Sequence, residues 1–402
     1  MESGRSKTMQ HALQVALTKK AFAHIDQGTT DMGRDVLRHP VSEYTCPDWL
    51  NREKSTLFRD FPLFMGLSGL IPEPGDFLAE DLGEIPTLLV RGDDGVARAF
   101  VNMCRHRGAP LAKGCGRNAS FICPYHAWNY NQRGELVGLP DKRSFPGVEQ
   151  EKMGLIALPT VEKDGMIWVI PTPDRNGAAH IEQQLTDHLG GLSDELASYQ
   201  FGGYHADMTR TITRRANWKQ PIETFLEAYH FNTLHKNTVA PLFFHNLCLF
   251  EDFGLNHREA VIRRSIETLR DRPESEWDFI THTGLSYQLF PNTIFVVQAD
   301  HVETWRVFPS KERVDECVIR FDCYIPEPVT SESARKHWDA NIDLAFKTVD
   351  EEDYAISEDI ERGYLSHALK EVLIGRNEPS LGHYKKSITQ AVKSSSDKKT
   401  GD

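Results

Sequence analysis

Two pairs of cysteine and histidine residues have the types and spacing of a metal centre. Cys104 and His106 are separated by one residue, Cys123 and His126 by two, and sixteen residues lie between His106 and Cys123. Each pair follows a strand-like run in a segment rich in glycine and proline. Two thiolates with two imidazoles suit a tetrahedral zinc ion, or a [2Fe-2S] cluster in which histidines replace two cysteines on one iron. The spacing alone leaves both centres open.

A second group of candidate ligands lies later in the chain. Residues 217–230 have a proline near the first turn and apolar residues at helical spacing, so they predict a helix. Glu223, Glu227 and His230 would share one polar line on it. His235 follows five residues after His230, which predicts that the helix bends or ends if both bind one ion. Two imidazoles and one carboxylate on one face of an iron leave positions open for O2.

The carboxylate must come from elsewhere, and the acidic run at 350–353 offers four candidates. Apolar residues around this run repeat at three- and four-residue steps, and they are Phe346, Val349, Ile356 and Ile360. Asp353 is the acid that falls on this stripe, and an acid on an inward face needs a partner such as a metal. We therefore predict Asp353 as the third ligand, with Asp350 as the fallback.

Both regions resemble the Rieske-type non-haem iron oxygenases, in the branch of the ring-hydroxylating large (alpha) subunits. CRHRGAPL at 104–111 and CPYHAW at 123–128 match the two halves of the cluster motif, with Ala127 where the family usually has glycine. Asn-Trp-Lys at 217–219 is followed by an acid, two residues, histidine, four residues and histidine, and later by a Glu-Asp pair, as in the family's iron motif. The resemblance extends from about residue 45 to about residue 379.

The resemblance assigns a role to each of these candidates. The ligands of a Rieske [2Fe-2S] cluster would be Cys104, His106, Cys123 and His126. The ligands of a mononuclear Fe(II) would be His230, His235 and Asp353. Glu227 would link a cluster histidine to an iron histidine across a subunit boundary. Many ring dihydroxylases have aspartate at that position, whereas glutamate occurs in other branches, including some that oxidise quaternary amines.

The fold implied is α+β, with an all-β Rieske domain placed before a helix-grip catalytic domain of antiparallel sheet and helices. The secondary-structure patterns of the sequence agree, because strand and turn patterns fill the region before residue 160 and helical patterns recur beyond it. The expected parts are an N-terminal helical segment packing on the catalytic domain (1–43), the Rieske domain (44–163), the catalytic domain (164–393) and a disordered tail (394–402).

The function implied is that of the oxygenase component of a multicomponent system. It would use O2, and electrons from NAD(P)H delivered by a flavin-dependent reductase and in some systems a ferredoxin, to mono- or dihydroxylate an aromatic or other apolar substrate. N- or O-demethylation, for example of a quaternary amine, is the alternative. A plain electron carrier and a zinc-binding module are further alternatives. A homotrimer is expected. Candidates for the substrate pocket are Phe231, Leu242, Phe243, Phe244, Phe250 and Phe295.

Composition and short patterns also bear on the binding partners, the location and the state of the cysteines. The formal net charge of −12 argues against a nucleic-acid or anionic membrane partner, and no apolar run reaches the ~18 residues of a membrane span, so we expect a cytoplasmic protein. The seven cysteines are scattered and odd in number, which is not typical of a disulfide framework. Cys115 is expected to be a buried thiol. The G-x-G-x-x-A pattern at 114–119 lies between the cluster ligands with no helix predicted after it, which argues against direct NAD(P)H binding.

Overall fold

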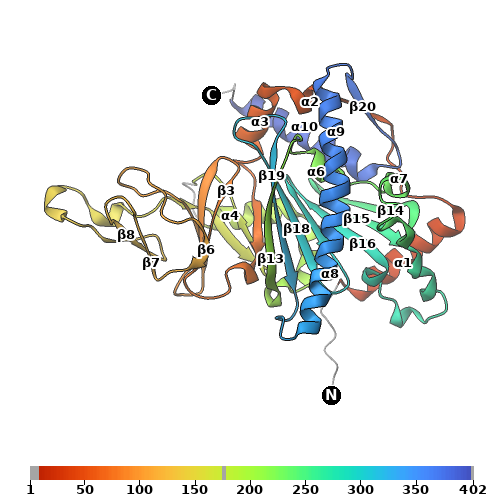
Figure 1. Cartoon of the computed structure of the whole chain (residues 1–402), viewed down its shortest axis with the longest axis horizontal. Coiled ribbons are helices and arrows are strands. Elements are labelled where there is room, and N and C mark those ends of the chain that lie inside the picture. Colours follow the sequence, from red (N-terminus) through yellow and green to blue (C-terminus); the bar gives the residue numbers. More distant parts are fainter. Residues whose placement is uncertain (1–8, 174–177, 400–402) are drawn as a thin grey trace. The chain divides into compact units, whose positions relative to one another are not determined.

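A computed structural model of the chain (Figure 1) describes residues 9–173 and 178–399. The chain forms two compact units: one is Phe58–Asp187, and the other joins Met1–Leu57 to His188–Asp402. The first boundary differs from the predicted residue 44 because the segment before residue 58 packs within the discontinuous unit; Glu53, for example, accepts a hydrogen bond from Trp218 Nε1 at 2.8 Å. Within the described residues, no helix combines the length and the apolar content of a membrane span.

The unit Phe58–Asp187 is built from three antiparallel sheets of five, three and three strands, with the orders β10-β5-β4-β3-β6, β11-β12-β2 and β7-β8-β9. The five-stranded sheet contains β3 (Asp76–Leu82), β4 (Ile85–Arg91), β5 (Ala97–Val101), β6 (Gly114–Arg117) and β10 (Ala157–Leu158). The other two contain β2 (Leu63–Leu67), β7 (Ser120–Ile122), β8 (Asn129–Asn131), β9 (Leu136–Gly138), β11 (Thr160–Lys163) and β12 (Met166–Val169). This β-rich unit confirms the fold class predicted for the cluster motif.

The other unit contains a seven-stranded antiparallel sheet in the order β13-β19-β18-β17-β16-β15-β14. Its strands are β13 (His205–Arg214), β14 (Phe243–Phe253), β15 (Asn256–Arg263), β16 (Thr283–Leu289), β17 (Thr293–Val297), β18 (Val302–Pro309) and β19 (Cys317–Ile325). Every residue of β17 and β18 is buried. β1 (Leu37–Pro40) pairs separately with β20 (Glu371–Ile374).

The helices are α1 (His11–Gln27), α2 (Ser42–Thr45), α3 (Pro47–Thr56), α4 (Ala178–Leu189), α5 (Leu192–Ser198), α6 (Gln220–Glu223), α7 (Phe231–Leu234), α8 (Glu332–Thr348), α9 (Tyr354–Leu365) and α10 (Pro379–Lys399). Helices α8 and α9 cross one face of the large sheet (Figure 1). Phe346 of α8 packs against Trp305 of β18 and Phe321 of β19, with ring centroids 5.7 and 5.0 Å apart. Each such aromatic pair stabilises the packing by about 0.5–1.5 kcal/mol beyond its buried area.

Both ends of the described chain pack on the large-sheet unit. In α1, the Gln14 side chain accepts a hydrogen bond from Phe279 N at 2.9 Å, and Phe22 lies edge-on to Trp277. Helix α10 continues to Lys399, so the disorder predicted from residue 394 does not begin there; residues 400–402 lie outside the described part. Extending a helix that tertiary packing already anchors avoids the cost of nucleation, which is why a polar sequence continues it.

Candidate metal centres

The two predicted cysteine and histidine pairs lie on two tight loops of the unit Phe58–Asp187. In the first loop, Gly108 N donates to the carbonyl of Cys104 at 2.9 Å. In the second, Ala127 N donates to the carbonyl of Cys123 at 3.0 Å. Ala127 has a φ of 56°, inside the small left-handed region that disfavours side chains. The geometry explains why glycine would suit this position and shows that alanine still adopts it.

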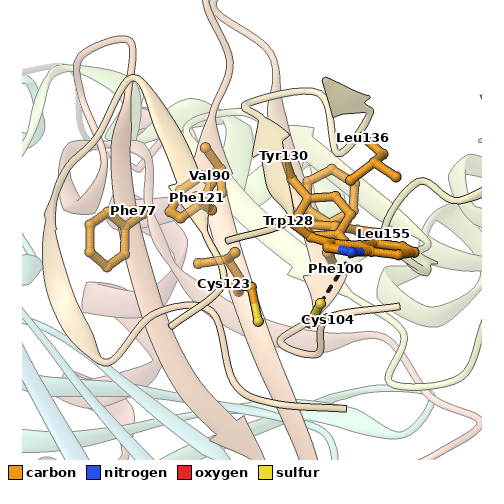
Figure 2. Packing of buried hydrophobic residues seen from close by; sticks show 11 residues of the cluster. Phe77, Val90, Phe100, Cys104, Phe121, Cys123, Trp128, Tyr130, Leu136 and Leu155 are labelled. Carbon is orange, nitrogen blue, oxygen red and sulfur yellow. Dashed lines mark hydrogen bonds between the residues drawn. The ribbon is translucent and has the colours of Figure 1, made fainter. Parts of the chain in front are cut away.

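The two cysteines lie in the core of this unit. Cys104 and Cys123 are only 1 and 3% exposed, and Figure 2 shows them among the aromatic side chains that include Trp128 and Tyr130. The Tyr130 hydroxyl lies 3.5 Å from Cys104 Sγ and accepts a hydrogen bond from Arg105 N at 3.0 Å. A hydroxyl held in this way has its proton available for the Cys104 sulfur.

The two histidines lie together beside this core. The rings of His106 and His126 are 4.7 Å apart, and His106 stacks on Trp128 with an interplanar angle of 7°. His106 Nδ1 is buried, and it has no hydrogen-bond partner among the described residues. Burial, followed by the charges of His126 and Arg107, lowers the pKa of His106. A neutral imidazole with an unused buried nitrogen fits a metal ligand.

The arrangement of these four side chains bears on the choice between zinc and a cluster. Among the described residues, the one group of three or more possible ligand side chains whose ligand atoms lie within 4.8 Å of one another is His230, His235 and Asp353. The cysteine and histidine pairs are therefore too widely spread for one tetrahedral ion. A cluster with two irons needs such a wider cage, so the residues fit the [2Fe-2S] group better than zinc.

Cys115 departs from its prediction, because it is exposed. It lies on β6, which pairs only with β3 in the five-stranded sheet, and all four residues of β6 are exposed. An edge strand that nothing covers leaves its side chains in solvent. The G-x-G-x-x-A pattern thus begins on a strand rather than opening a helix, which agrees with rejecting a dinucleotide site.

The single helix predicted over residues 217–230 is wrong. Helix α6 ends at Glu223 and α7 begins at Phe231, and the residues between them form turns. The Glu227 carboxylate accepts hydrogen bonds from the backbone N–H groups of Tyr229 and His230, at 2.5 and 3.2 Å. Such local bonds offer the backbone an alternative to the helix. Tyr229, one of the apolar residues at helical spacing in this segment, is 59% exposed as a result.

This break allows His230 and His235 to converge with Asp353. The two Nε2 atoms are 3.1 Å apart, and Asp353 Oδ1 lies 3.1 Å from His235 Nε2 and 3.4 Å from His230 Nε2. Asp353 is 4% exposed. Despite these distances, its Oδ1 accepts no well-aligned hydrogen bond from the described residues. Two nitrogens and one unsatisfied buried carboxylate oxygen that face one point form a set of donors suited to a divalent cation.

Two further carboxylates hold the outer sides of the two imidazoles. Glu227 bonds to Nδ1 of His230, and Glu352 Oε2 lies 2.7 Å from Nδ1 of His235. Thr238 Oγ1 also donates to Glu352, at 2.8 Å. These contacts keep the proton of each ring on Nδ1 and leave Nε2 to face the centre. Sequence reasoning did not single out Glu352, because helical spacing points it away from Asp353.

The backbone around Asp353 is a π-helical segment, Val349–Asp353, between α8 and α9. The wider turn shifts the phase of the following helix, so its buried residues are Tyr354, Ser357, Glu361 and Tyr364. Ile356 and Ile360, predicted on the inward stripe, are 38 and 40% exposed. Asp353 was therefore assigned to the inward face correctly, although the stripe used to find it does not continue beyond the π segment. Such segments are frequent at functional sites.

Two other acids considered from the sequence are occupied elsewhere. Asp350, the fallback ligand, pairs with Arg214 at 2.5 Å. Glu223 pairs with Lys385 and accepts a hydrogen bond from the Tyr44 hydroxyl at 3.0 Å. Both serve packing within the unit and do not join the group around Asp353.

The electrostatics of the group favour a bound cation. Burial by itself would lower the pKa of His230, but Asp353 and Glu227 outweigh it and raise that pKa to about 10. Burial is likewise outweighed at His235, whose pKa is raised by Asp353 and then Glu352. Without a metal this concentration of carboxylates retains protons on the histidines, and a divalent ion would replace them.

A cavity of about 440 Å³ opens beside His235 and Asp353. Of the predicted pocket residues, Phe231, Leu242 and Phe243 line it. The other three do not: Phe244 packs under Arg264, Phe250 lies near His257 and His383, and Phe295 is in the core against Phe201. The wall also contains polar groups that composition gave no reason to expect, among them Arg263, Gln298 and Glu303.

Comparison with known proteins places both units in described families. Residues 65–159 match the model of the Rieske [2Fe-2S] domain, and residues 201–394 match that of the ring hydroxylating alpha subunit, catalytic domain. These matches are in the order that the two motifs predict. They confirm the resemblance on which the interpretation of the motifs rests.

Curated relatives include oxygenases for two kinds of substrate. The chain is 31% identical to the glycine betaine monooxygenase oxygenase subunit of Chromohalobacter salexigens over 51% of this chain and 46% of that one. It is 24% identical to the chloroplastic choline monooxygenase of Amaranthus tricolor over 82 and 72%. It is 31% identical to the large oxygenase component of a naphthalene 1,2-dioxygenase system of Ralstonia sp over 56 and 46%. The match thus spans about half the length of the first and third relatives.

Solved structures show the same fold. A quaternary ammonium Rieske monooxygenase in complex with an inhibitor superposes with a TM-score of 0.76 at 20% identity, covering 89% of this chain and 96% of that one. Naphthalene 1,2-dioxygenase with bound indole superposes with a TM-score of 0.67 at 18% identity, covering 89 and 95%. At these identities the likeness concerns the fold alone.

Proposed function

Because this chain belongs to the Rieske-type non-haem iron oxygenases, in the branch of the ring-hydroxylating alpha subunits, we propose that it is the oxygenase component of a multicomponent oxygenase. The family's cofactors are a Rieske [2Fe-2S] cluster and a mononuclear non-haem iron. The observation that carries the proposal is the convergence of His230, His235 and Asp353 within 4.8 Å beside a cavity of about 440 Å³. An electron carrier would need neither feature.

We assign the cluster to Cys104, His106, Cys123 and His126. Burial keeps the two cysteine sulfurs away from water, and the Tyr130 hydroxyl beside Cys104 helps to stabilise negative charge on sulfur. The stacking of His106 on Trp128 holds its ring in one orientation. These residues would keep the cluster's geometry unchanged as it takes and gives electrons.

We assign the iron to His230, His235 and Asp353. The bound Fe(II) would supply activation of O2, with electrons from the cluster. Glu227 and Glu352 keep the protons of His230 and His235 on Nδ1, so both Nε2 lone pairs face the metal. The two carboxylates are positioning groups. Glu227 is also the residue proposed to bond a cluster histidine of a neighbouring subunit, which would shorten the electron path.

The cavity favours a small organic substrate held near the metal. Apolar side chains such as Phe231, Leu242 and Phe243 exclude water and orient the carbon to be oxidised. Hydroxylation of an aromatic or other apolar substrate is the first candidate reaction. Oxidation of an N-methyl group of a quaternary amine is the second. It is favoured by glutamate at 227 and by phenylalanine rings, whose faces also suit a cation.

The partners follow from the proposed chemistry. Electrons from NAD(P)H would arrive through a flavin-dependent reductase, with or without a ferredoxin. A homotrimer in which the cluster of one subunit serves the iron of the next completes the proposal. We propose a cytoplasmic location, and no nucleic-acid or membrane partner.

Iron analysis with EPR on anaerobically purified protein tests the assignment. We expect about three irons per chain, two in the cluster and one mononuclear, and a reduced-state signal typical of a His-ligated cluster. His235→Ala should lose one iron and keep the cluster signal. Cys123→Ala should lose the cluster signal.

Oxygen uptake with a surrogate reductase then tests the activity. We expect product formation coupled to O2 consumption for the wild type, and neither for His235→Ala. A protein with two irons, a full cluster signal and no substrate-dependent O2 uptake would support the electron carrier instead. Zinc without iron would refute both assignments.

A further inference from the structure

The wall of the cavity contains one cation whose hydrogen-bonding capacity is largely unused. Arg263 lies at the end of β15; the residue is half-buried, and its Nε is fully enclosed. Nη2 donates to the Gln298 amide oxygen at 3.1 Å, and the guanidinium lies 5.5 Å above the ring of Phe243. Nε has no hydrogen-bond partner among the described residues.

The fully buried arginines of this unit are matched by acids. Arg258 pairs with Glu195 and Glu251, and Arg306 pairs with Asp322 at 3.0 Å. Arg263 has no carboxylate within ion-pair distance among the described residues, and the charge of Asp300, which lines the same cavity, acts on it from beyond that distance. An enclosed N–H group without an acceptor is costly, so a half-buried guanidinium on a cavity wall with no carboxylate beside it indicates that a partner enters the cavity.

The acids on the same wall are not available for a substrate cation. Glu303 lies 3.1 Å from His301 Nε2 and accepts a hydrogen bond from Trp305 Nε1 at 3.2 Å. Asp300 lies 2.8 Å from His301 Nδ1 and 2.8 Å from His337 Nε2. Burial would lower the pKa of His301, but Asp300 and Glu303 raise it to about 9, so both of its ring nitrogens donate at neutral pH. The hydrogen-bonding groups that remain unused on this wall are therefore those of a positive charge, the Arg263 guanidinium.

We propose that Arg263 binds a carboxylate of the substrate, so that this oxygenase acts on a small organic acid or zwitterion and not on a neutral hydrocarbon or alcohol. The proposal rests on the oxygenase function above and names its substrate class. A guanidinium presents two parallel N–H groups that match a carboxylate, and Gln298 with Phe243 holds it in place. The apolar side chains would then surround the carbon that is oxidised.

Calorimetric titration of the anaerobic holoenzyme with matched pairs of probes tests the proposal. Benzoate and benzyl alcohol form one pair; glycine betaine and choline, which share a trimethylammonium group, form the other. For at least one pair we expect the carboxylate to bind about tenfold or more tightly than its neutral-ended partner, because charge-assisted hydrogen bonds are the strong ones. In Arg263→Gln this preference should fall to about twofold or less, and Arg263→Lys should recover part of it.

Arg264→Gln is the matched control, because it removes the same charge from the adjacent, exposed residue, whose guanidinium lies over Phe244. It should keep the wild-type preference. Iron content and far-UV circular dichroism establish that each variant is folded. If Arg263→Gln does not fold, the carboxylate preference is tested with Arg263→Lys instead.

The proposal is overturned if neither carboxylate binds better than its partner, or if Arg263→Gln keeps the preference. Oxygen uptake is measured separately. Carboxylate binding that depends on Arg263, without coupled O2 uptake, would refute the oxygenase function alone. Turnover of neutral probes that is indifferent to Arg263 would refute this inference alone.

Discussion

Replacing Glu352 with glutamine should weaken Fe(II) binding while leaving the [2Fe-2S] cluster in place. The Glu352 carboxylate lies 2.7 Å from Nδ1 of His235 and accepts a hydrogen bond from Thr238 at 2.8 Å. Glutamine keeps an oxygen at this position but loses the negative charge. The Nδ1 proton is then held less firmly, and Nε2 becomes a weaker ligand.

The expected size of the effect follows from these contacts. Loss of an outer partner of a metal-bound histidine costs about 10- to 100-fold in metal affinity, or about 1.4–2.7 kcal/mol. The Glu352 side chain is 22% exposed, so water screens part of its charge. We therefore expect the lower part of that range for Glu352→Gln, about 10- to 30-fold.

Anaerobic competition of the protein with a coloured Fe(II) chelator measures this change. Glu351→Gln is the control, because it removes the same charge from the neighbouring, exposed acid of the same π-helical segment. The control should bind Fe(II) within about twofold of the wild type, as surface charges contribute little. Equal affinities for Glu352→Gln and Glu351→Gln would refute the argument that the hydrogen bond to His235 supports the metal.

Three other changes should have effects that the structure explains. With Fe(II) supplied in excess, Glu227→Ala should keep about three irons per chain but lose coupled product formation, because His230 loses its outer partner and the proposed link to a neighbouring cluster disappears. Product formed at the wild-type rate would contradict this role. Ala127→Gly should stabilise the cluster unit by about 0.5–1 kcal/mol, seen as a higher unfolding temperature, since the φ of 56° costs alanine more than it costs glycine; a lower temperature would count against it. Burial raises the pKa of Glu259 to about 8 from 4.5, so the folded state keeps a proton that the unfolded chain loses between these values. The free energy of unfolding should thus fall as the pH rises through that window, by at most about 1.4 kcal/mol per pH unit. Glu259→Gln should make the urea midpoint of unfolding depend less on pH between pH 5 and 8. An equal pH dependence in the variant and the wild type would exclude this carboxyl as the cause.

The two cysteine and histidine pairs, and His230 with His235, could be singled out from the sequence because their spacing is local. Cys104 and His106 lie on one loop, and Cys123 and His126 on another, so spacing within a few residues reveals each pair. Such signals depend on a short stretch of backbone and survive without knowledge of the rest of the fold.

The two helical predictions at the iron site failed for different physical reasons. Residues 217–230 have helical periodicity, but the Glu227 carboxylate binds nearby N–H groups and turns the chain after Glu223. At Val349–Asp353 a wider turn changes the phase, which exposes Ile356 and Ile360. Periodicity assumes 3.6 residues per turn throughout, so it cannot foresee either departure.

The sequence by itself determined the two motifs, the order of the two parts and the chemistry that their ligands allow, because these depend on residue types and short spacing. Only the tertiary structure revealed Glu352 behind His235, and Arg263 unpaired on the cavity wall. His235 and Glu352 are 117 residues apart in the chain, and Arg263 and Gln298 are 35 apart. Contacts of this kind arise when packing brings distant strands and helices together, and whether a buried charge has a partner is decided by that packing alone.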